Sequence, residues 1–324
     1  MKIEECYGKD YIFVDVRSPK EFAEDHIPGA INIPLFSNEE RAIVGTLYKQ
    51  VGKDVAIEKG LEIVGHKLPE MIQQYQQYKT QKVIIYCWRG GMRSGSVVGL
   101  LQSLQFDAYQ LEKGYKDYRR FVREQFDTIP FPPLVILYGL TGSGKTEILR
   151  QLENSIDLEG LAQHRGSIFG DIGLVQRSQK MFESLLLKRL FELQHQKVIF
   201  IERESRKIGQ VMIPLSIWDA MDDAQKVKVV CSSEERVERL YKEYCTGMDK
   251  ILIIQKIHSI QKYLGKKKAD ELITLLEQSK VKEVIHVILL DYYDVLYKYT
   301  IDSKEYSYTI HDLADLKRIF SSIL

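Results

Sequence analysis

The sequence predicts an α/β fold of two domains, each built on a parallel sheet. Short, uninterrupted apolar runs alternate with helical patterns along the chain. Two glycine-containing loops each follow such a run and open a helix, and a proline-rich segment separates the halves. This alternation is typical of parallel sheets, whose strands are buried on both faces. A length of 324 residues allows two domains with separate cores.

The first half contains two predicted buried strands, 11–16 (YIFVDV) and 83–87 (VIIYC). Residues 95–104 are predicted to form the helix that follows the second strand. The stretch between the strands, about 38–79, is long, polar and amphipathic, and predicts inserted helices. We therefore assign residues 1–127 to the first domain.

The proline-rich segment 128–133 is the predicted linker, because proline removes amide donors and stiffens the chain. The second domain, 134–324, is expected to contain the remaining strands and helices, with binding elements toward the C-terminal end of the sequence. Its predicted strands are 134–140, 197–202 and 226–231, and helical patterns cover 178–194 and 233–244.

Charge and cysteine content limit the class of protein. Lys and Arg number 46 against 45 Asp and Glu, so the net charge of +1 neither requires nor excludes nucleic acid. No apolar run approaches the roughly 20 residues of a membrane helix, and no secretory h-region is visible, so we expect a cytoplasmic protein without membrane contact. No cysteine spacing suggests zinc or disulfides, and no metal ligand set is predicted; the cysteines are Cys6, Cys87, Cys231 and Cys245.

The first loop, YCWRGGMRS (86–94), predicts an anion pocket around Cys87. A helix that begins near Ser94 directs its positive end and several N–H groups inward. Arg89 or Arg93 would further stabilise a thiolate. The alternative is a buried structural cysteine, which two glycines and two arginines disfavour. The remaining predicted loop residues are Trp88, Gly90, Gly91 and Met92.

The first half resembles the rhodanese family through FVDVRSPKEFAEDHIPGAINIPL (13–35) and the loop at Cys87. In that family the cysteine forms a persulfide. Asp15 and Arg17 are interpreted as a structural ion pair at a strand end. Five residues separate Cys87 from Arg93, whereas many rhodaneses have four. The longer spacing resembles the related cysteine phosphatases, so phosphatase activity is a rival hypothesis, although no Asp general acid lies next to the loop.

The second loop fits the phosphate-binding pattern G-x-x-x-x-G-K-[ST] in its strand-to-helix context. Lys145 supplies a mobile positive charge, and the Thr146 hydroxyl is suited to Mg²⁺. ATP or GTP would fit this loop, and the sequence offers no base-recognition element that identifies the ligand. The predicted diphosphate-binding residues are Gly139, Thr141, Gly142, Ser143, Gly144, Lys145 and Thr146.

Two further stretches carry polar side chains next to glycine or a strand end. After the predicted strand 197–202, an acid, metal or substrate role is assigned to Glu202, Glu204, Ser205 and Arg206, although such carboxylates are often only solvated. The stretch HRGSIFG (164–170) is either a substrate loop or an exposed connection. Its candidate residues are His164, Arg165, Gly166 and Ser167.

The whole chain resembles the bacterial tRNA 2-selenouridine synthase family, which joins a rhodanese-like domain to a P-loop NTPase-like domain. Four stretches carry the resemblance: ERAIVGTLYKQVG (40–52), HRGSIFG, IERESRKIG (201–209) and DYYDVLY (291–297). Val295 departs from the family's pattern, where proline is expected. The resemblance implies geranylation of wobble 2-thiouridine from geranyl diphosphate, followed by replacement of S-geranyl by selenium from selenophosphate. The implied substrates are tRNAs for Lys, Glu and Gln.

The resemblance also implies roles for the two loops. Cys87 and Arg93 would act on selenophosphate, with contact to selenophosphate synthetase as a further expectation, and Lys145 would stabilise the departing diphosphate. No tightly bound cofactor is expected beyond Mg²⁺ with the diphosphate. Alternatives are a nucleotide-dependent kinase or NTPase, or a sulfurtransferase, with a rhodanese appendage. Basic residues predicted to bind tRNA are Arg119, Arg120, Arg123, Arg203, Lys207, Lys266 and Lys267, although each patch alone is more often a solvated face.

Overall fold

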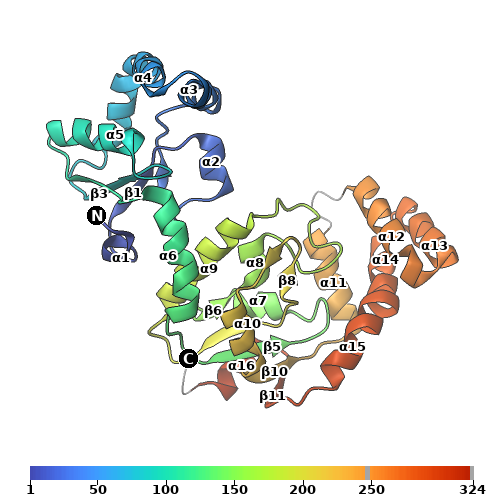
Figure 1. Cartoon of the computed structure of the whole chain (residues 1–324). Helices are drawn as coiled ribbons and strands as arrows, with labels where there is room; N and C mark the ends of the chain where they lie inside the picture. Colours follow the sequence, from blue (N-terminus) through green and yellow to red (C-terminus); the bar gives the residue numbers. More distant parts are fainter. Residues whose placement is uncertain (245–248, 322–324) are drawn as a thin grey trace. The chain divides into compact units, whose positions relative to one another are not determined.

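The computed structural model describes residues 1–244 and 249–321, which form two compact units (Figure 1). The first unit comprises Met1–Ile129 together with Glu183–Phe191, and the second comprises Pro130–Phe182 and Glu192–Leu324. The main sheet of each unit is wholly parallel, which confirms the predicted α/β class.

The sheet of the first unit has four strands in the order β2-β1-β3-β4. They are β1 (Ile12–Asp15), β2 (Ile31–Asn32), β3 (Val83–Tyr86) and β4 (Ala108–Gln110). All four residues of β3 are buried, as expected for a central parallel strand. The helices are α1 (Ile3–Cys6), α2 (Pro19–Glu24), α3 (Asn38–Gln50), α4 (Lys53–Gln76), α5 (Met92–Ser103) and α6 (Gly114–Thr128).

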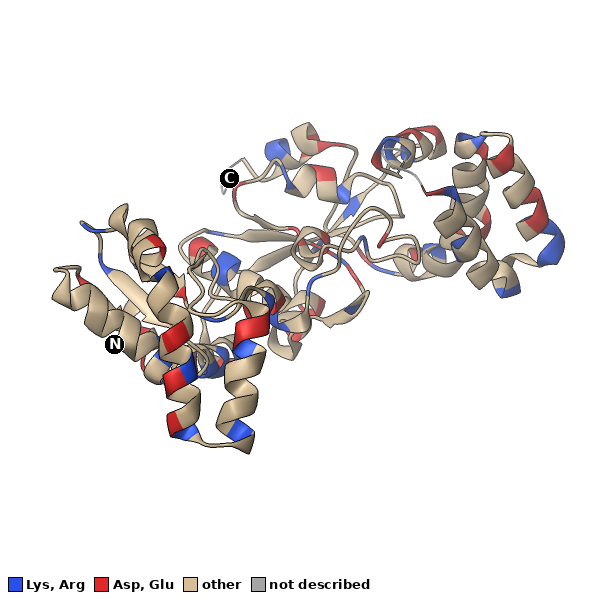
Figure 2. Ribbon diagram, turned by 90° about the horizontal axis from the view of Figure 1, so that it is seen from above, with Lys and Arg blue, Asp and Glu red and all other residues tan. Residues whose placement is uncertain are grey.

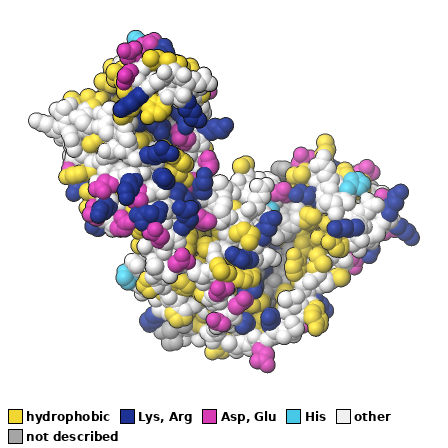
Figure 3. Space-filling view, viewed as in Figure 1, with side chains coloured by type: hydrophobic (Ala, Val, Ile, Leu, Met, Phe, Trp, Pro, Cys, Tyr) yellow, Lys and Arg dark blue, Asp and Glu magenta, His cyan; other side chains and the backbone are white. Residues whose placement is uncertain are grey.

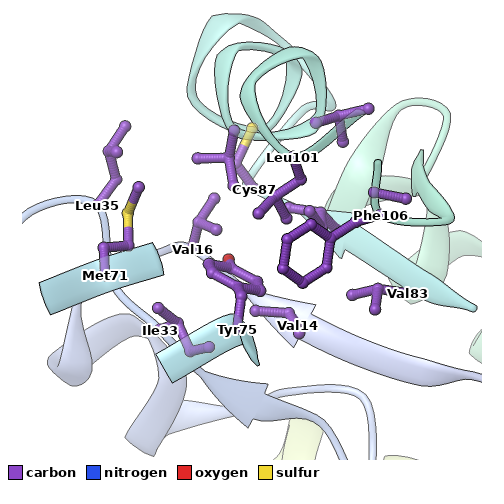
Figure 4. Packing of buried hydrophobic residues seen from close by; sticks show 14 of the residues in the cluster. Val14, Val16, Ile33, Leu35, Met71, Tyr75, Val83, Cys87, Leu101 and Phe106 are labelled. Atoms are coloured by element: carbon purple, nitrogen blue, oxygen red, sulfur yellow. The ribbon is translucent and has the colours of Figure 1, made fainter. Parts of the chain in front are cut away.

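The inserted helices expected between the first two predicted strands are α3 and α4. Helix α3 begins after Ser37, whose hydroxyl accepts a hydrogen bond from the Glu40 amide at 3.2 Å. Helix α4 contributes Met71 and Tyr75 to the core beside the sheet (Figure 4). The insertion therefore completes the hydrophobic core of the first unit.

The predicted ion pair at the end of β1 is confirmed. Arg17 Nη2 lies 2.6 Å from Asp15 Oδ2, and both side chains are buried. Arg17 also donates to the backbone carbonyl of Asp25 at 2.6 Å and lies over the ring of Tyr115. These contacts give the pair a role in the fold of the unit.

Most of α9 (Gln179–Leu193), namely Glu183–Phe191, belongs to the first unit, although the sequence places it in the second half. The ring of Phe191 packs against Tyr7 with a centroid distance of 5.1 Å. The Ser184 hydroxyl donates to Asp25 at 2.9 Å across 159 positions of sequence. A linear boundary could not anticipate contacts between segments so far apart.

The sheet of the second unit has the order β11-β10-β5-β7-β6. Its strands are β5 (Leu134–Tyr138), β6 (Ser155–Ile156), β7 (Ile199–Glu202), β10 (Gln225–Val229) and β11 (Tyr308–Ile310). The phosphate-binding loop follows the central strand β5, so it lies at the carboxyl edge of the sheet, where such sheets bind ligands. The unit also contains α7 (Lys145–Leu149), α8 (Leu158–Ala162), α10 (Leu215–Asp222), α11 (Ser233–Tyr244), α16 (Leu313–Ile319) and the hairpin β8 (Lys207–Ile208) and β9 (Val211–Met212).

A helical cluster with its own core follows α11 in the second unit. It contains α12 (Lys250–Leu264), α13 (Lys266–Glu277), α14 (Val281–Ile288), the π-helical turn η1 (Leu289–Tyr293) and α15 (Asp294–Asp302). Val295 lies at the second position of α15 and is 72% exposed. Because η1 leads into α15 without a break, Val295 lies inside a continuous helical segment, where valine keeps the backbone amide that proline would remove.

Lys and Arg residues alternate with Asp and Glu residues along the helices of both units (Figure 2). Among the described residues, no helix is long and apolar enough to cross a membrane.

Candidate functional site

The loop at Cys87 connects β3 to α5, and its path requires glycine at Gly90 within the loop and at Gly114, which begins α6 and packs against it. Gly90 has φ of 60°, and an added Cβ would lie 2.7 Å from the carbonyl oxygen of Leu111. Gly114 has φ of 57°, and a Cβ there would overlap with the carbonyl oxygen of Cys87. The backbone at Gly114 thus packs directly against the loop, and no larger residue fits either position.

The Cys87 sulfur lies 3.2 Å from the Ser94 hydroxyl oxygen, and the residue is 3% exposed. Gln110 Nε2 donates to the same hydroxyl oxygen at 2.9 Å, which leaves the hydroxyl hydrogen able to point toward the sulfur. Burial raises the pKa of the Cys87 thiol, but the Ser94 hydroxyl, the Arg93 charge and the loop amides outweigh burial, so the pKa is lowered overall. A lowered pKa favours the reactive interpretation over a structural cysteine.

Arg93 lies at the start of α5 and its Nη1 is 3.5 Å from Glu21 Oε2. Arg41 approaches the same carboxylate oxygen at 3.7 Å. Burial raises the pKa of Glu21, but the two arginines and a backbone hydrogen bond outweigh it and lower the pKa overall, which keeps this carboxylate charged. Arg93 is therefore held in place by Glu21, a residue of the rhodanese-like stretch 13–35 that the sequence did not assign to this loop.

The side chains at the rim of the same loop are exposed. Trp88 is 38% exposed and its ring lies 5.2 Å from that of Tyr115, whereas Met92 is 52% exposed. Arg89 is also exposed. The loop thus combines a buried sulfur with an open rim, an arrangement suited to an anionic group that enters from solvent.

The phosphate-binding loop has the backbone conformation that its glycines allow. Gly142 and Gly144 have φ of 77° and 97°, which favour glycine. Lys145 Nζ donates to the carbonyl oxygen of Gly139 at 3.0 Å. The Ser143 hydroxyl is buried and has no hydrogen-bond partner in the described part of the chain. The structure thus brings the predicted diphosphate-binding residues together in one loop.

Thr146 contacts two carboxylates. Its hydroxyl lies 3.0 Å from Glu202 Oε2 and 3.2 Å from Glu159 Oε2. The amide of Glu159 also donates to Glu202 Oε1 at 3.1 Å. Glu202 was predicted as the acid near this hydroxyl, whereas Glu159 was not.

Three carboxylates crowd this end of the sheet. Burial and the charge of Glu204 raise the pKa of Glu159 to about 8, and burial and the charge of Glu202 raise the pKa of Glu204 to about 7. Burial and the charge of Glu159 raise the pKa of Glu202 well above its usual range. Among the described residues, no group of three or more His, Cys, Asp or Glu side chains is arranged to hold a metal ion.

Two arginines of α11 contact the backbone of the phosphate-binding loop. Arg239 Nη1 donates to the carbonyl oxygen of Gly142 at 2.6 Å, and its Nε donates to Glu147 at 2.9 Å. Arg236 Nε donates to the carbonyl oxygen of Thr141 at 2.8 Å. A helical spacing of three residues places both guanidinium groups on one face, which is the local signal that could have drawn attention to them.

The predicted substrate loop lies next to these groups but its residues have different environments. His164 is buried, with its pKa lowered by burial, and packs closely against Gly170 and Gly209. Arg165 pairs with Glu243 at 2.6 Å and lies over the ring of Tyr244. Gly166 has φ of 62°, and a Cβ there would overlap with the carboxylate of Glu204. Gly166 therefore lets this loop approach the three carboxylates.

A cavity of about 1220 Å³ extends from the phosphate-binding loop. Its charged lining residues include Lys145, Glu159 and Glu204, which lie near one another beside the loop. Aromatic and aliphatic side chains also line the cavity; this set, which we call the apolar wall, comprises Tyr138, Trp218, Tyr244, Tyr293, Leu296, Tyr297 and Ile301. Figure 3 shows a hollow over the second unit with hydrophobic side chains along one side. The cavity can accept a ligand with both an anionic and an apolar part.

Residues after β7 are divided between the cavity and other contacts. Arg203 lines the cavity, stacks over the Trp218 ring at 4.2 Å and pairs with Asp222 at 2.9 Å. Ser205 also lines the cavity. Arg206 Nε donates to the carbonyl oxygen of Ile213 at 3.5 Å, and Lys207 is exposed on β8.

The basic residues predicted to bind tRNA differ in accessibility. Arg119 is buried and forms ion pairs with Asp25 and Glu183. Arg120 is engaged with three carboxylates, those of Glu4, Asp117 and Glu124. The exposed members of the predicted set are Arg123, Lys207, Lys266 and Lys267.

The two loops define a class of protein: a rhodanese-like domain joined to a phosphate-binding-loop domain. Residues 4–120 match the family model of the rhodanese-like domain. Residues 132–316 match the family model of the tRNA 2-selenouridine synthase AAA domain. The second match spans more than half of the chain.

Relatives of similar length are named for the same activity. The tRNA 2-selenouridine synthase of Photobacterium profundum is 34% identical over 93% of this chain and 91% of its own length. That of Shewanella halifaxensis is 34% identical over 92% of this chain and 91% of its own. The chain belongs to the tRNA 2-selenouridine synthase family and is an enzyme of the transferase type.

One solved structure covers part of the chain. The N-terminal domain of a Clostridium difficile 630 protein named for ATP/GTP binding is 52% identical, with a TM-score of 0.37. The match covers 38% of this chain and 97% of that domain.

Proposed function

We propose that this enzyme converts 2-thiouridine to 2-selenouridine at the wobble position of tRNAs for Lys, Glu and Gln, in two steps with different donors. Two features carry the proposal. In the second unit, one cavity combines the phosphate-binding loop with the apolar wall, and a prenyl diphosphate needs both. In the first unit, the pKa of the Cys87 thiol is lowered, which suits reaction with a phosphate-bearing selenium donor.

The first step is assigned to the cavity of the second unit. The diphosphate of geranyl diphosphate binds the loop amides and Lys145, and the geranyl chain lies along the apolar wall. The thiocarbonyl sulfur attacks C1 of the geranyl group, the C–O bond breaks, and diphosphate leaves. Because N3 of the base loses its proton in the same overall change, the product is a neutral S-geranyl base. Lys145 stabilises the charge that develops on the leaving diphosphate.

The second step uses selenophosphate at the Cys87 loop. Alkylation has turned the sulfur into a good leaving group, so selenium adds at C2 and geranyl thiolate departs. Cleavage of the P–Se bond, with water as the source of oxygen, yields phosphate. The Cys87 thiolate and Arg93 act on the donor, and the loop amides hold its phosphoryl group. Because selenophosphate is reactive, direct transfer from selenophosphate synthetase at the open rim is part of the proposal.

Magnesium with the diphosphate is also part of the proposal. The donors near the loop are hard oxygens, with the Thr146 hydroxyl between two carboxylates, and oxygen ligands suit Mg²⁺. A bound cation would supply charge neutralisation for the diphosphate. The chain's own part is to position Thr146 and Lys145 at the same end of the cavity.

Binding of tRNA is assigned to exposed basic residues. Those with accessible side chains are Arg123, Lys207, Lys266 and Lys267. Phosphate contacts of this kind make affinity fall as salt rises. Arg119 and Arg120 have no place in the proposed tRNA contact, because carboxylates of the chain already engage them.

The decisive experiment is mass spectrometry of wobble nucleosides after the protein is incubated with thiolated tRNA and both donors. We expect S-geranyl-2-thiouridine when selenophosphate is omitted and 2-selenouridine when both donors are present. Lys145→Ala should block the first product, and Cys87→Ala should block only the second. RNA-independent ATP hydrolysis that depends on Lys145 would instead support a kinase or NTPase. Sulfur or phosphate release from simple donors without tRNA would support a sulfurtransferase or phosphatase.

A further inference from the structure

Gln110 ends β4 on the same face of the first sheet as Cys87. Strands β3 and β4 pair in parallel with Gln110 opposite Ile85, and Cys87 follows Ile85 by two positions. Residues two apart along a strand point to the same face, and both Ile85 and Cys87 pack into the core of this unit. The register of the sheet therefore brings the Gln110 side chain to the Cys87 loop.

The amide group of Gln110 makes two hydrogen bonds within this loop. Its Nε2 donates to the carbonyl oxygen of Gly91 at 2.9 Å and to the hydroxyl oxygen of Ser94 at 2.9 Å. An amide nitrogen carries two hydrogens, so each acceptor receives one of them. Because a carbonyl oxygen can only accept, the nitrogen of the amide and not its oxygen must face Gly91. The amide thus has one defined orientation.

This orientation determines where the hydrogen of the Ser94 hydroxyl points. The hydroxyl has one hydrogen and two acceptors within reach, the Cys87 sulfur at 3.2 Å and the Gly91 carbonyl oxygen at 3.4 Å. The second distance is longer than the roughly 2.5–3.0 Å usual between the oxygens of such a bond, and Gln110 already donates to that carbonyl. The hydroxyl hydrogen is therefore directed to the sulfur. Donation from Gln110 also polarises the hydroxyl and strengthens its own donation.

The charged side chains that face the loop come from three helices. Burial raises the pKa of the thiol, whereas the hydroxyl and the charge of Arg93 on α5 lower it. Glu21 on α2 holds Arg93, and Arg41 on α3 approaches the same carboxylate. Gln110 is uncharged and its side chain hydrogen-bonds within the loop. Its replacement by another uncharged residue therefore leaves these charges in place.

We propose that Gln110 is a positioning residue of the Cys87 loop, whose amide aligns the Ser94 hydroxyl so that its hydrogen is donated to the Cys87 sulfur and stabilises the thiolate. Gln110 acts through Ser94 and not on the sulfur itself. The inference rests on the proposed function for its place in the reaction, because the thiolate meets the selenium donor in the second step. It adds a neighbouring strand to the set of elements that prepare the thiolate.

The test is the pH profile of Cys87 alkylation by iodoacetamide in the full chain, read by peptide mass spectrometry. Gln110→Leu removes the amide at similar size, and the midpoint should move to higher pH by about 0.4–1 unit, the equivalent of one neutral hydrogen bond. Ser94→Ala should move it in the same direction. In the double variant the shift should equal that of Ser94→Ala alone, because Gln110 has no hydroxyl left to align.

Gln102→Leu is the matched control. Gln102 lies on α5 and its Nε2 donates to the carbonyl oxygen of Ala108 at 2.8 Å, so the same chemical change removes an amide hydrogen bond outside the Cys87 loop. Its alkylation profile should match that of the native chain. Thermal unfolding of each variant separates a changed thiol from a changed fold. If Gln110→Leu unfolds, Gln110→Met replaces it, because methionine keeps the unbranched shape and also lacks the two donors.

Three outcomes overturn the inference. The midpoint stays unchanged or falls in Gln110→Leu and Gln110→Met, or the shifts of Gln110→Leu and Ser94→Ala add in the double variant, or Gln102→Leu shifts the midpoint equally. Alkylation does not require selenium transfer, so the expected shifts without any 2-selenouridine would leave the role of Gln110 standing and overturn the proposed second step. Selenium transfer that depends on Cys87, with unmoved profiles, would do the reverse.

Discussion

The guanidinium of Arg236 bridges the phosphate-binding loop and Asp294. Its Nη2 and Nη1 donate to the two carboxylate oxygens of Asp294 at 2.6 and 2.9 Å, while its Nε donates to the carbonyl oxygen of Thr141 at 2.8 Å. Both ionic side chains are largely buried, with 5% and 14% exposure. A two-pronged pair of this kind is geometrically specific, so it fixes α15 against the loop and thereby shapes the cavity.

Removing the carboxylate should therefore damage the site as well as the fold. In Asp294→Ala the guanidinium stays buried without its partner, which typically costs about 3–5 kcal/mol of unfolding free energy. We expect weaker geranyl diphosphate binding, measured by calorimetry, and a lower Tm. The control is Asp291→Ala, whose exposed pair with Lys268 should contribute no more than about 1 kcal/mol. Equal effects of the two changes would contradict the role of the bridge.

The Ser94 hydroxyl should control the reactivity of Cys87. Because it helps to lower the pKa of the Cys87 thiol, Ser94→Ala should move the pH profile of alkylation by iodoacetamide to higher pH. The thiolate is the form that reacts, and a lower pKa lets it persist to lower pH. Without the Ser94 hydroxyl the thiolate should therefore form only at higher pH. Peptide mass spectrometry reports the site of alkylation.

Two other cysteines serve as internal references for that measurement. Burial raises the pKa of Cys6 to about 11, so this thiol should react slowly at neutral pH. Cys231 is partly exposed beside Arg239, and its profile should be the same in both proteins. An unchanged Cys87 profile in Ser94→Ala would remove Ser94 from the activation of the thiol.

Gly166→Ala should disturb the carboxylate cluster. The added Cβ would overlap with the Glu204 carboxylate, in addition to the strain of an alanine at φ of 62°. We expect a loss of unfolding free energy of about 1–3 kcal/mol and slower geranyl transfer. Gly173→Ala serves as the control, because Gly173 has a similar φ of 71° but no atom near the position of an added Cβ. It therefore reports the cost of backbone strain without a steric overlap. If both variants lose geranyl transfer equally, displacement of Glu204 is not the cause.

The raised pKa of Glu204 predicts a pH-dependent stability. The folded chain keeps the proton of this carboxyl until pH reaches about 7, whereas the unfolded chain releases it near the ordinary value of 4.5. The folded state thus holds more protons between these values, and unfolding free energy falls as pH rises through the window. In Glu204→Gln this fall should be smaller, as measured by denaturant unfolding in chelator-treated buffer. A steeper fall in the variant would reverse the sign of the argument.

Local motifs were predictable from the sequence because their geometry is set within one strand, loop and helix. The loops at Cys87 and Lys145 each need glycines at fixed spacing, and the structure places each loop between the predicted strand and helix. The parallel sheets and the inserted helices α3 and α4 follow from hydrophobic periodicity in the same way. The ion pair of Asp15 and Arg17 is similarly local, since a single residue separates the partners.

Tertiary structure alone decided the groups that complete the site. Thr146 lies in α7, which follows β5, and Glu159 lies in α8, which follows β6. Because β5 and β6 flank β7 in the sheet, both residues meet Glu202 at the end of β7. Arg236 meets Asp294 across 58 positions, and Ser167 lines the same cavity as Tyr293 across a longer separation still. Arg119, a basic residue predicted to meet tRNA, is buried against Asp25 and a residue of α9. No local spacing encodes such pairs, because the packing of whole helices and strands brings their side chains together. The sequence by itself determined the chemistry of the two loops, and the tertiary structure determined which residues surround them.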